Sequence, residues 1–176
     1  ESHIFDKIVM RENCHIREHR FAYKIDSMLN SPYEKTIFLD TDAAFQSVKA
    51  LDIFNILDEF DIAVAHAPIR ETVQLDEIPH CFPEFNTGVI AYNNSSQVRE
   101  VLEEWRRSYL DCARGSVRHG VHHDQVSFRY ALYFSKLRIA TLPDEYNCRL
   151  TNPEKVGSFK GQWHIWHNRS KIEKYK

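Results

Sequence analysis

The chain has 176 residues, of which 43% are hydrophobic and 27% are charged, a balance typical of globular proteins that excludes wholesale disorder. At this length residues 1–176 are expected to form a single domain with a substantial core. The 23 basic and 25 acidic residues give a net charge of -2, whereas a nucleic-acid-binding domain is usually basic, so no nucleic-acid partner is expected.

In chain order, the first half of the sequence predicts strands that alternate with helices. An apolar run at 5–10 favours a strand, and residues 18–29 have helical periodicity that ends at Ser31-Pro32. The predicted elements that follow are a buried strand at 36–39, a helix at 49–60 with Leu51, Phe54 and Leu57 on its apolar face, and a buried strand at 62–65.

The second half begins with a long loop at 68–87, which carries three prolines. A strand at 88–92 follows, and Ser95 and Ser96 are N-cap candidates for an amphipathic helix that reaches residue 112. A helix at 124–134, a strand at 137–142 and a short apolar stretch at 163–166 complete the pattern. Strands that alternate with helices predict a layered α/β fold.

Two aspartates, Asp40 and Asp42, directly follow the apolar strand at 36–39. Positions i and i+2 of an extended chain point the same way, so both carboxylates are expected at the carboxyl end of this strand, where open α/β sheets bind ligands. Two such close charges repel unless a cation lies between them, and hard divalent metals prefer oxygen ligands. The alternative is a pair of solvated turn aspartates, one of which caps the next helix.

Three other polar groups could contribute to a site. Asn86 and Thr87 precede Gly88, which permits a tight turn or a close approach to a ligand. The segment 122–125, His-His-Asp-Gln, begins a predicted helix, where free N–H groups favour anions. His164 and His167 flank an aromatic stretch. Each group also has an ordinary structural interpretation: an Asn/Gly turn, a helix cap and structural histidines.

Together, the segments FLDTD, FNTGVI, HHDQ, LPDEYN and a late WH resemble the motifs of GT-A-type nucleotide-sugar glycosyltransferases, particularly the glycogenin-like branch. The resemblance covers roughly residues 20–170. It implies a mixed, mostly parallel central sheet flanked by helices, and transfer of a sugar from a nucleotide-diphosphate donor, expected to be a UDP-sugar, with retention of configuration. Only 39 residues precede Asp40, so the resemblance also implies that part of the N-terminal nucleotide-binding half is lacking.

The resemblance assigns roles by position. Asp40, Asp42 and His167 would hold Mn²⁺ or Mg²⁺ against the pyrophosphate of the donor. Asp124 and Gln125 would lie under the reacting sugar as the catalytic pair. The residues expected to bind the donor are Lys24, Asp40, Thr41, Asn86, Thr87 and Lys171, and Arg169 and Lys174 could add to a basic clamp on the leaving diphosphate.

Two other functions remain open at this level. A non-catalytic nucleotide-sugar-binding domain could keep the fold without turnover. Haloacid-dehalogenase-like phosphatases also place DxD after a strand, but they usually have Thr or Val where this chain has Ala44. The sequence does not identify the acceptor, which could be a carbohydrate, a lipid or a protein, nor the oligomeric state.

The compartment is also open between the cytoplasm and the Golgi lumen. No apolar stretch approaches the roughly 18 residues of a membrane span, and residues 1–10 show no basic leader followed by a long apolar run. The four cysteines form no CxxC pair, so neither a cysteine-based zinc site nor a disulfide framework is indicated.

Overall fold

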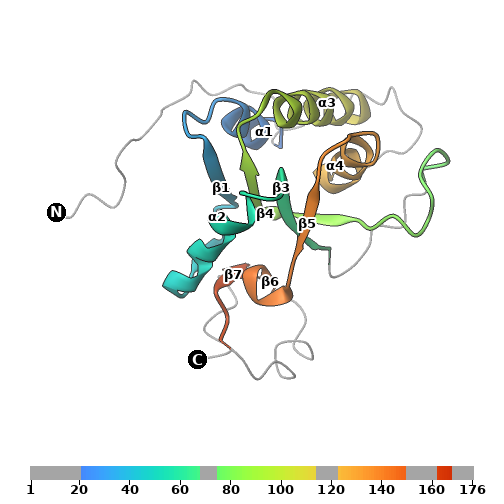
Figure 1. The fold of residues 1–176 in the computed structure, drawn as a ribbon. Helices are drawn as coiled ribbons and strands as arrows, with labels where there is room; N and C mark the ends of the chain where they lie inside the picture. The colour runs from blue at the N-terminus through green and yellow to red at the C-terminus, as the bar shows by residue number, and fades with distance from the viewer. Residues whose placement is uncertain (1–20, 68–74, 114–122, 150–161, 168–176) are drawn as a thin grey trace.

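A computed structural model describes residues 21–67, 75–113, 123–149 and 162–167. Within these ranges a four-stranded sheet lies at the centre, with long helices on one side and a smaller sheet and short helices on the other (Figure 1). The expected strand at 5–10 and the basic residues Arg169, Lys171 and Lys174 lie outside the described residues.

The central sheet has the order β1 (Lys35–Leu39), β4 (Phe85–Asn93), β3 (Ile62–His66) and β5 (Ile139–Leu142). β4 is antiparallel to both β1 and β3, whereas β3 and β5 are parallel. The predicted mixed sheet is therefore confirmed: β1, β3 and β5 run in one direction and β4 runs against them. Because β4 is reversed, its first residues lie at the edge of the sheet where β1 ends.

One face of the sheet is covered by α1 (Ala22–Leu29), α3 (Ser96–Ala113) and α4 (Asp124–Tyr133) (Figure 1). Ser95 Oγ accepts a hydrogen bond from the Val98 N–H at 3.3 Å, so Ser95 is the N-cap of α3. The largest fully buried side chains at this interface come from the three helices and from β3 and β4: Ile25, Met28, Ile62, Ile90, Tyr92, Leu102, Trp105, Tyr109, Phe128 and Leu132.

The other face packs against η2 (Val48–Asp52), α2 (Ile53–Ile56) and a three-stranded sheet. That sheet has the order β2 (Ala43–Phe45), β7 (Ile165–His167), β6 (Cys148–Arg149), and η3 (Asp144–Tyr146) directly precedes β6. β2 and β7 are antiparallel, and β6 and β7 are parallel. Among the described helices, none is long and apolar enough to cross a membrane.

The helix predicted at 49–60 is wrong in its extent, and its predicted apolar face is only partly right, because Leu57 is buried and Phe54 packs against the core but Leu51 does not. A 3₁₀-helix and one short α-helix replace it, and the buried residues are Ala50, Ile53 and Leu57, while Leu51 is half exposed. The 3₁₀ geometry explains the difference, because it brings residues three apart, such as Ala50 and Ile53, onto one side.

β4 begins three residues before the predicted strand at 88–92, so the predicted loop at 68–87 extends too far. Residues 85–92 are all buried, since both faces of this strand are covered. Asn86 and Thr87 therefore lie inside the strand instead of in a turn before it.

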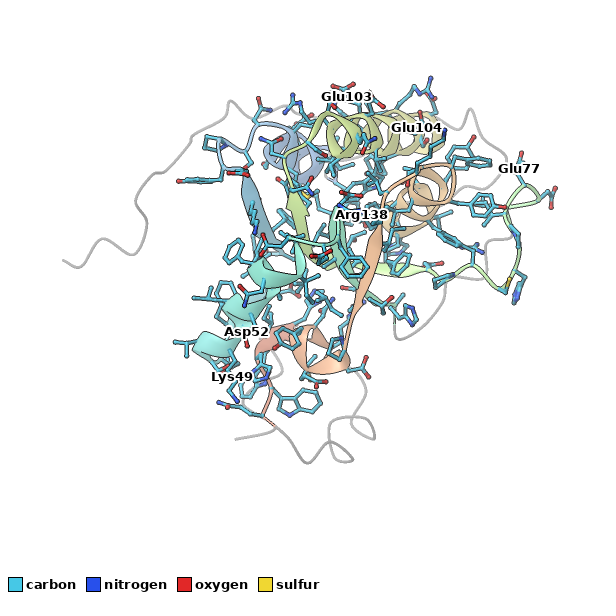
Figure 2. All side chains as sticks on the ribbon, in the orientation of Figure 1. Lys49, Asp52, Glu77, Glu103, Glu104 and Arg138 are labelled. Atoms are coloured by element: carbon cyan, nitrogen blue, oxygen red, sulfur yellow. The ribbon has the colours of Figure 1, made fainter. Side chains whose placement is uncertain are left out.

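An ion pair at the side of the sheet links the beginnings of β3 and β5. Arg138, which lies just before β5 (Figure 2), donates to Asp61 from its backbone N–H at 2.8 Å and from Nη2 at 3.2 Å. These hydrogen bonds hold the pKa of the Asp61 carboxyl below its ordinary value, with Asn93 Nδ2 as a further donor. The carboxylate is therefore more favourable in the folded than in the unfolded chain.

Asp61→Asn is expected to lower stability at neutral pH, where the carboxylate is charged in both states. The difference from the wild type should shrink as the pH falls below the ordinary aspartate pKa of about 3.9 and through the lowered pKa of the folded state. Urea unfolding of both proteins across this pH range measures it. A difference that stays constant to the lowest pH would contradict the assigned ion pair.

Candidate active site

Asp40 and Asp42 stand where β1 leaves the sheet. The Asp40 N–H donates to the Gly88 carbonyl at 2.8 Å, which continues the pairing of β1 with β4 by one residue. The Asp40 carbonyl accepts from the Ala43 N–H at 2.9 Å, so the chain turns tightly into β2. Thr41 lies exposed at this turn, between the two carboxylates.

Asn86, Thr87 and Gly88 occupy an irregular part of β4. Val64 of β3 pairs with Ile90, and His66 pairs with Phe85. Between these two pairs β3 has one residue, whereas β4 has the four residues 86–89. β4 therefore bulges, and a bulge bends a strand and re-aims its side chains. The bulge lies beside Asp40, whose N–H bonds to the Gly88 carbonyl, and the side chains of Asn86 and Thr87 bond to residues of α4.

His167 reaches the same place from the far end of the chain. It is the last residue of β7 and pairs with Ala43 of β2. Gly88 makes the approach feasible: a Cβ atom at this position would lie 1.9 Å from His167 Cε1. The glycine thus leaves the space that the imidazole ring fills.

The structure brings the three predicted metal-ligating side chains together. One ligand atom from each of Asp40, Asp42 and His167 lies within 4.8 Å of the others. His167 Nε2 is 3.4 Å from Asp42 Oδ1 and 3.8 Å from Asp40 Oδ2. Burial lowers the pKa of His167 to about 4, with Arg149 and Lys24 acting in the same direction and Asp42 against it. The imidazole is therefore neutral at pH 7, the form that binds metals.

Lys24 of α1 connects this group to the start of α4. Its Nζ lies 2.5 Å from Asp124 Oδ2 and 3.5 Å from Asp40 Oδ1, and it donates to Thr87 Oγ1 at 3.0 Å. The lysine side chain is only 10% exposed. The predicted donor-binding lysine is thus placed between two carboxylates, where it holds the two halves of the site at a fixed separation.

The charges of the site favour a cation. Burial raises the pKa of Asp40, the charges of Asp124 and Asp42 raise it further, and Lys24 partly offsets them. Three carboxylates, those of Asp40, Asp42 and Asp124, outnumber the two nearby cations, Lys24 and Arg149, so the site carries a net negative formal charge. A hard divalent cation beside two carboxylates and a neutral imidazole would balance this charge, so the residues present fit Mn²⁺ or Mg²⁺.

Asp124 and Gln125 begin α4 with their side chains buried. Asp124 Oδ2 accepts from Thr87 Oγ1 at 2.9 Å, and Gln125 Oε1 accepts from Asn86 Nδ2 at 3.1 Å. The N-cap is His123, and no side-chain hydrogen bond caps the helix. The alternative that Asp124 serves as a helix cap is therefore wrong.

The other predicted histidines do not join this group, and His122 lies outside the described residues. His123 is exposed, and His164 lies apart from the carboxylates, with its Nδ1 2.7 Å from Ser47 Oγ. Sequence reasoning gave no role to Asn147, whose Oδ1 lies 2.9 Å from His167 Nδ1. Its position in LPDEYN was the signal that could have identified it.

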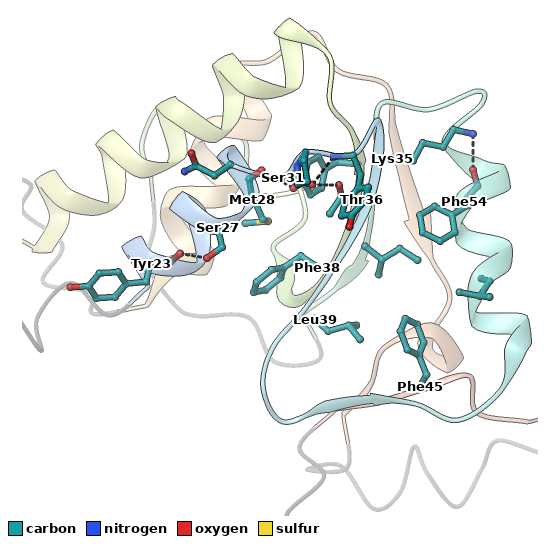
Figure 3. A pocket seen from close by; sticks show the side chains of 16 residues that line it. Tyr23, Ser27, Met28, Ser31, Lys35, Thr36, Phe38, Leu39, Phe45 and Phe54 are labelled. Atoms are coloured by element: carbon teal, nitrogen blue, oxygen red, sulfur yellow. Dashed lines mark hydrogen bonds between the residues drawn. The ribbon is translucent and has the colours of Figure 1, made fainter. Parts of the chain in front are cut away.

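A separate groove of about 910 Å³ runs along the outer side of β1, between α1 and α2 (Figure 3). Phe38, Leu39, Phe45 and Phe54 line it among others, and Lys35 donates to the Phe54 carbonyl across its upper end. β1 is an edge strand of the sheet among the described residues.

Neither a protein-family model nor a curated protein sequence matches the chain. Solved structures do. The apo form of the glycosyltransferase GlyE of Streptococcus pneumoniae is 19% identical, with a TM-score of 0.54 over 89% of this chain and 38% of GlyE. Mouse xyloside xylosyltransferase 1 is 16% identical, with a TM-score of 0.51 over 84% of this chain and 63% of that protein. The bifunctional glycosyltransferase WbbM is 14% identical, with a TM-score of 0.51 over 85% of this chain and 31% of WbbM.

The chain thus spans less than two thirds of the length of these three proteins. The comparisons do not distinguish the glycogenin-like branch from others. What they support is the fold, with TM-scores of 0.51 to 0.54 over most of this chain. The described part of this chain has the GT-A glycosyltransferase fold.

Proposed function

We propose that this chain is the metal-binding and sugar-binding part of a glycosyltransferase that moves a sugar from a UDP-sugar to an acceptor. One observation carries the proposal. Asp40, Asp42 and His167 meet at the sheet edge, and Lys24 and Thr87 connect this group to Asp124 of α4. A metal-ligand set beside buried polar groups suits a donor that has a diphosphate at one end and a sugar at the other.

The two carboxylates and His167 Nε2 present lone pairs to one point. A bound Mn²⁺ or Mg²⁺ supplies charge neutralisation for the leaving diphosphate. Lys24 fixes Asp40 relative to Asp124 through its short contacts with both. Thr41 lies exposed in the turn between the ligands, where it can contact the donor, and Lys171 completes the proposed donor-binding set from outside the described residues.

In this proposal the donor sugar is bound by four residues: Asn86, Thr87, Asp124 and Gln125. Their side chains bond to one another in pairs, so each is held in one orientation before the donor arrives. Asp124 is the buried carboxylate among these four residues, and a fixed negative charge in a water-poor site would stabilise a cationic sugar centre strongly. Retention of configuration is part of this proposal.

The test is calorimetry of the chain with UDP in the presence and absence of Mn²⁺, followed by a screen of nucleotide sugars for release of UDP. We expect weak UDP binding that loses about tenfold or more in affinity without the metal, because the diphosphate end makes most of the contacts. Binding without sugar consumption would favour the non-catalytic alternative. Release of phosphate from a phosphate ester without any nucleotide binding would favour the phosphatase.

Asp42→Asn is expected to remove most of the metal dependence of UDP binding, because it takes away a charged ligand of the proposed site. Asp52→Asn is the matched control, since Asp52 is an exposed carboxylate on η2 (Figure 2). Both variants are titrated with UDP and Mn²⁺. Equal metal dependence in the Asp42→Asn variant and the wild type would contradict the assigned ligand.

A further inference from the structure

Asn147 lies buried between the imidazole of His167 and the amide of Asn86, with 6% of its surface exposed. Its Oδ1 is 2.9 Å from His167 Nδ1, and its Nδ2 donates to Asn86 Oδ1 at 2.9 Å. With the bond from Asn86 to Gln125, these contacts form a continuous chain from α4 to β7.

A backbone group fixes the direction of every hydrogen bond in this chain. The Gly88 N–H can only donate, and it lies 3.1 Å from Asn86 Oδ1, so the atom of Asn86 that faces it must be the oxygen. That oxygen also faces Asn147, which must therefore present its NH₂ group to Asn86. The carbonyl oxygen of Asn147 then faces His167.

An amide oxygen cannot donate a hydrogen bond, so His167 must carry its proton on Nδ1. In a neutral imidazole the other nitrogen, Nε2, then keeps its lone pair. Nε2 is the atom that lies 3.4 Å from Asp42 and 3.8 Å from Asp40. The orientation of one asparagine thus decides whether the ring presents a lone pair or a proton to the two carboxylates.

We propose that Asn147 is a positioning residue that holds His167 in the Nδ1–H tautomer and so makes Nε2 available as a metal ligand. The inference rests on the proposed function, because it concerns the same metal site. Ligating histidines commonly donate their second ring nitrogen to an oxygen acceptor, which fixes the tautomer and the orientation of the ring.

Backbone hydrogen bonds around Asn147 fix its position relative to His167. The Asn147 N–H donates to the Asp144 carbonyl at 3.1 Å, which closes η3. The next residue, Cys148, begins β6 and pairs with Trp166, directly before His167. Asn147 directly precedes β6 and His167 is the last residue of β7. Because these two strands are paired, the distance between the two side chains is fixed by the sheet.

Loss of Asn147 would favour the wrong tautomer. The buried Nδ1–H would have no acceptor, which is costly, whereas a proton on Nε2 could donate to Asp42 at 3.4 Å. The same two carboxylates that suit a cation would then bind the imidazole proton instead. Asn147 therefore prevents a competing hydrogen bond from His167 Nε2–H to Asp42.

Two substitutions separate the tautomer from simple packing. Asn147→Asp keeps an oxygen that accepts from His167 Nδ1–H, whereas Asn147→Leu has nearly the same size and accepts nothing. Asn94→Leu is the matched control, since Asn94 also bonds through its amide, to the Ser31 carbonyl at 3.1 Å, and it directly follows β4, at the opposite end of that strand from Asn86. Titration with Mn²⁺ alone measures the site without any donor.

We expect Mn²⁺ affinity to fall by about 10-fold to 100-fold in Asn147→Leu, and to stay within about threefold of the wild type in Asn147→Asp and Asn94→Leu. Proton–nitrogen NMR of the histidine rings should show Nδ1–H for His167 in the metal-free wild type and in Asn147→Asp.

Two results would overturn the inference while leaving the proposed function intact: wild-type chain that binds Mn²⁺ with His167 protonated on Nε2, or Asn147→Leu that binds Mn²⁺ like the wild type. Wild-type chain that does not bind Mn²⁺ at all, even with UDP present, would instead reject the proposed metal site. The NMR measurement on the wild type decides the tautomer even if Asn147→Leu fails to fold.

Discussion

Replacement of Gly88 by alanine is expected to displace the ring of His167 from its place beside Asp40 and Asp42. The added Cβ would lie 1.9 Å from Cε1 and 2.6 Å from both ring nitrogens, far inside van der Waals contact. Both groups lie in buried, paired strands, so neither can move cheaply. We expect a loss of about 1–3 kcal/mol in the free energy of unfolding, measured by urea denaturation, and loss of most Mn²⁺ binding by calorimetry.

The control is the same substitution in a chain that already carries His167→Ala. With the ring removed, the methyl group added at position 88 has space, so the second substitution should cost much less stability than it does in the wild type. This difference is a coupling energy between residues in contact. Equal costs in the two backgrounds would show that Gly88 is needed for the backbone of β4 and not for the approach of His167.

Asp124→Asn is expected to reduce the rate of sugar transfer by about 10²–10³, the usual effect of removing one strong electrostatic contact to a transition state. UDP affinity should change much less, because the proposed role of Asp124 is toward the sugar and not toward the diphosphate. The two effects are separated by kcat and by calorimetry with UDP and Mn²⁺.

Asp124→Asn should also lower stability, since the ammonium of Lys24 loses its 2.5 Å partner. Breaking a buried pair costs about 3–5 kcal/mol when nothing replaces the lost partner. We expect less here, because Asp40 and the oxygens of Thr87 remain in contact with Lys24.

Asp26→Asn is the matched control, because Asp26 pairs with Arg106 at 2.6 Å on the part of α1 away from the carboxylates. It should leave kcat unchanged. If Asp124→Asn lowers stability and leaves the rate per folded molecule unchanged, Asp124 is a structural partner of Lys24 and not a catalytic group.

Local pattern was sufficient for much of the fold. The apolar runs at 36–39, 62–65 and 137–142 are strands or contain one, since short β-branched and apolar segments must be buried to be stable. The apolar periodicity that begins after Ser95 is that of α3, because a single apolar stripe can be buried by a helix only at 3.6 residues per turn, and the helix predicted at 124–134 is α4. Asp40 and Asp42 were also readable, since they follow a buried strand and share one side of an extended chain.

Other features depend on pairings between distant segments. The reversal of β4 between β1 and β3 brings Asn86 and Thr87 to the end of the sheet where β1 ends, and the extra residues in β4 form a bulge there. Their side chains bond to residues of α1 and α4. Neither the direction of a strand nor a bulge in it can be predicted from its own residues, because both depend on the strands on either side.

The site around His167 shows the same distinction most clearly. From the sequence, Gly88 is predicted to be a turn residue. In the structure it leaves space for the imidazole ring of His167, 79 positions later in the chain. Asn147 reads as an ordinary polar residue until its two amide atoms are seen between His167 and Asn86. Side-chain chemistry determined which residues could bind a metal and a sugar. Steric exclusion and hydrogen-bond direction, which exist only between packed neighbours, determined which of them meet and which atom each one presents.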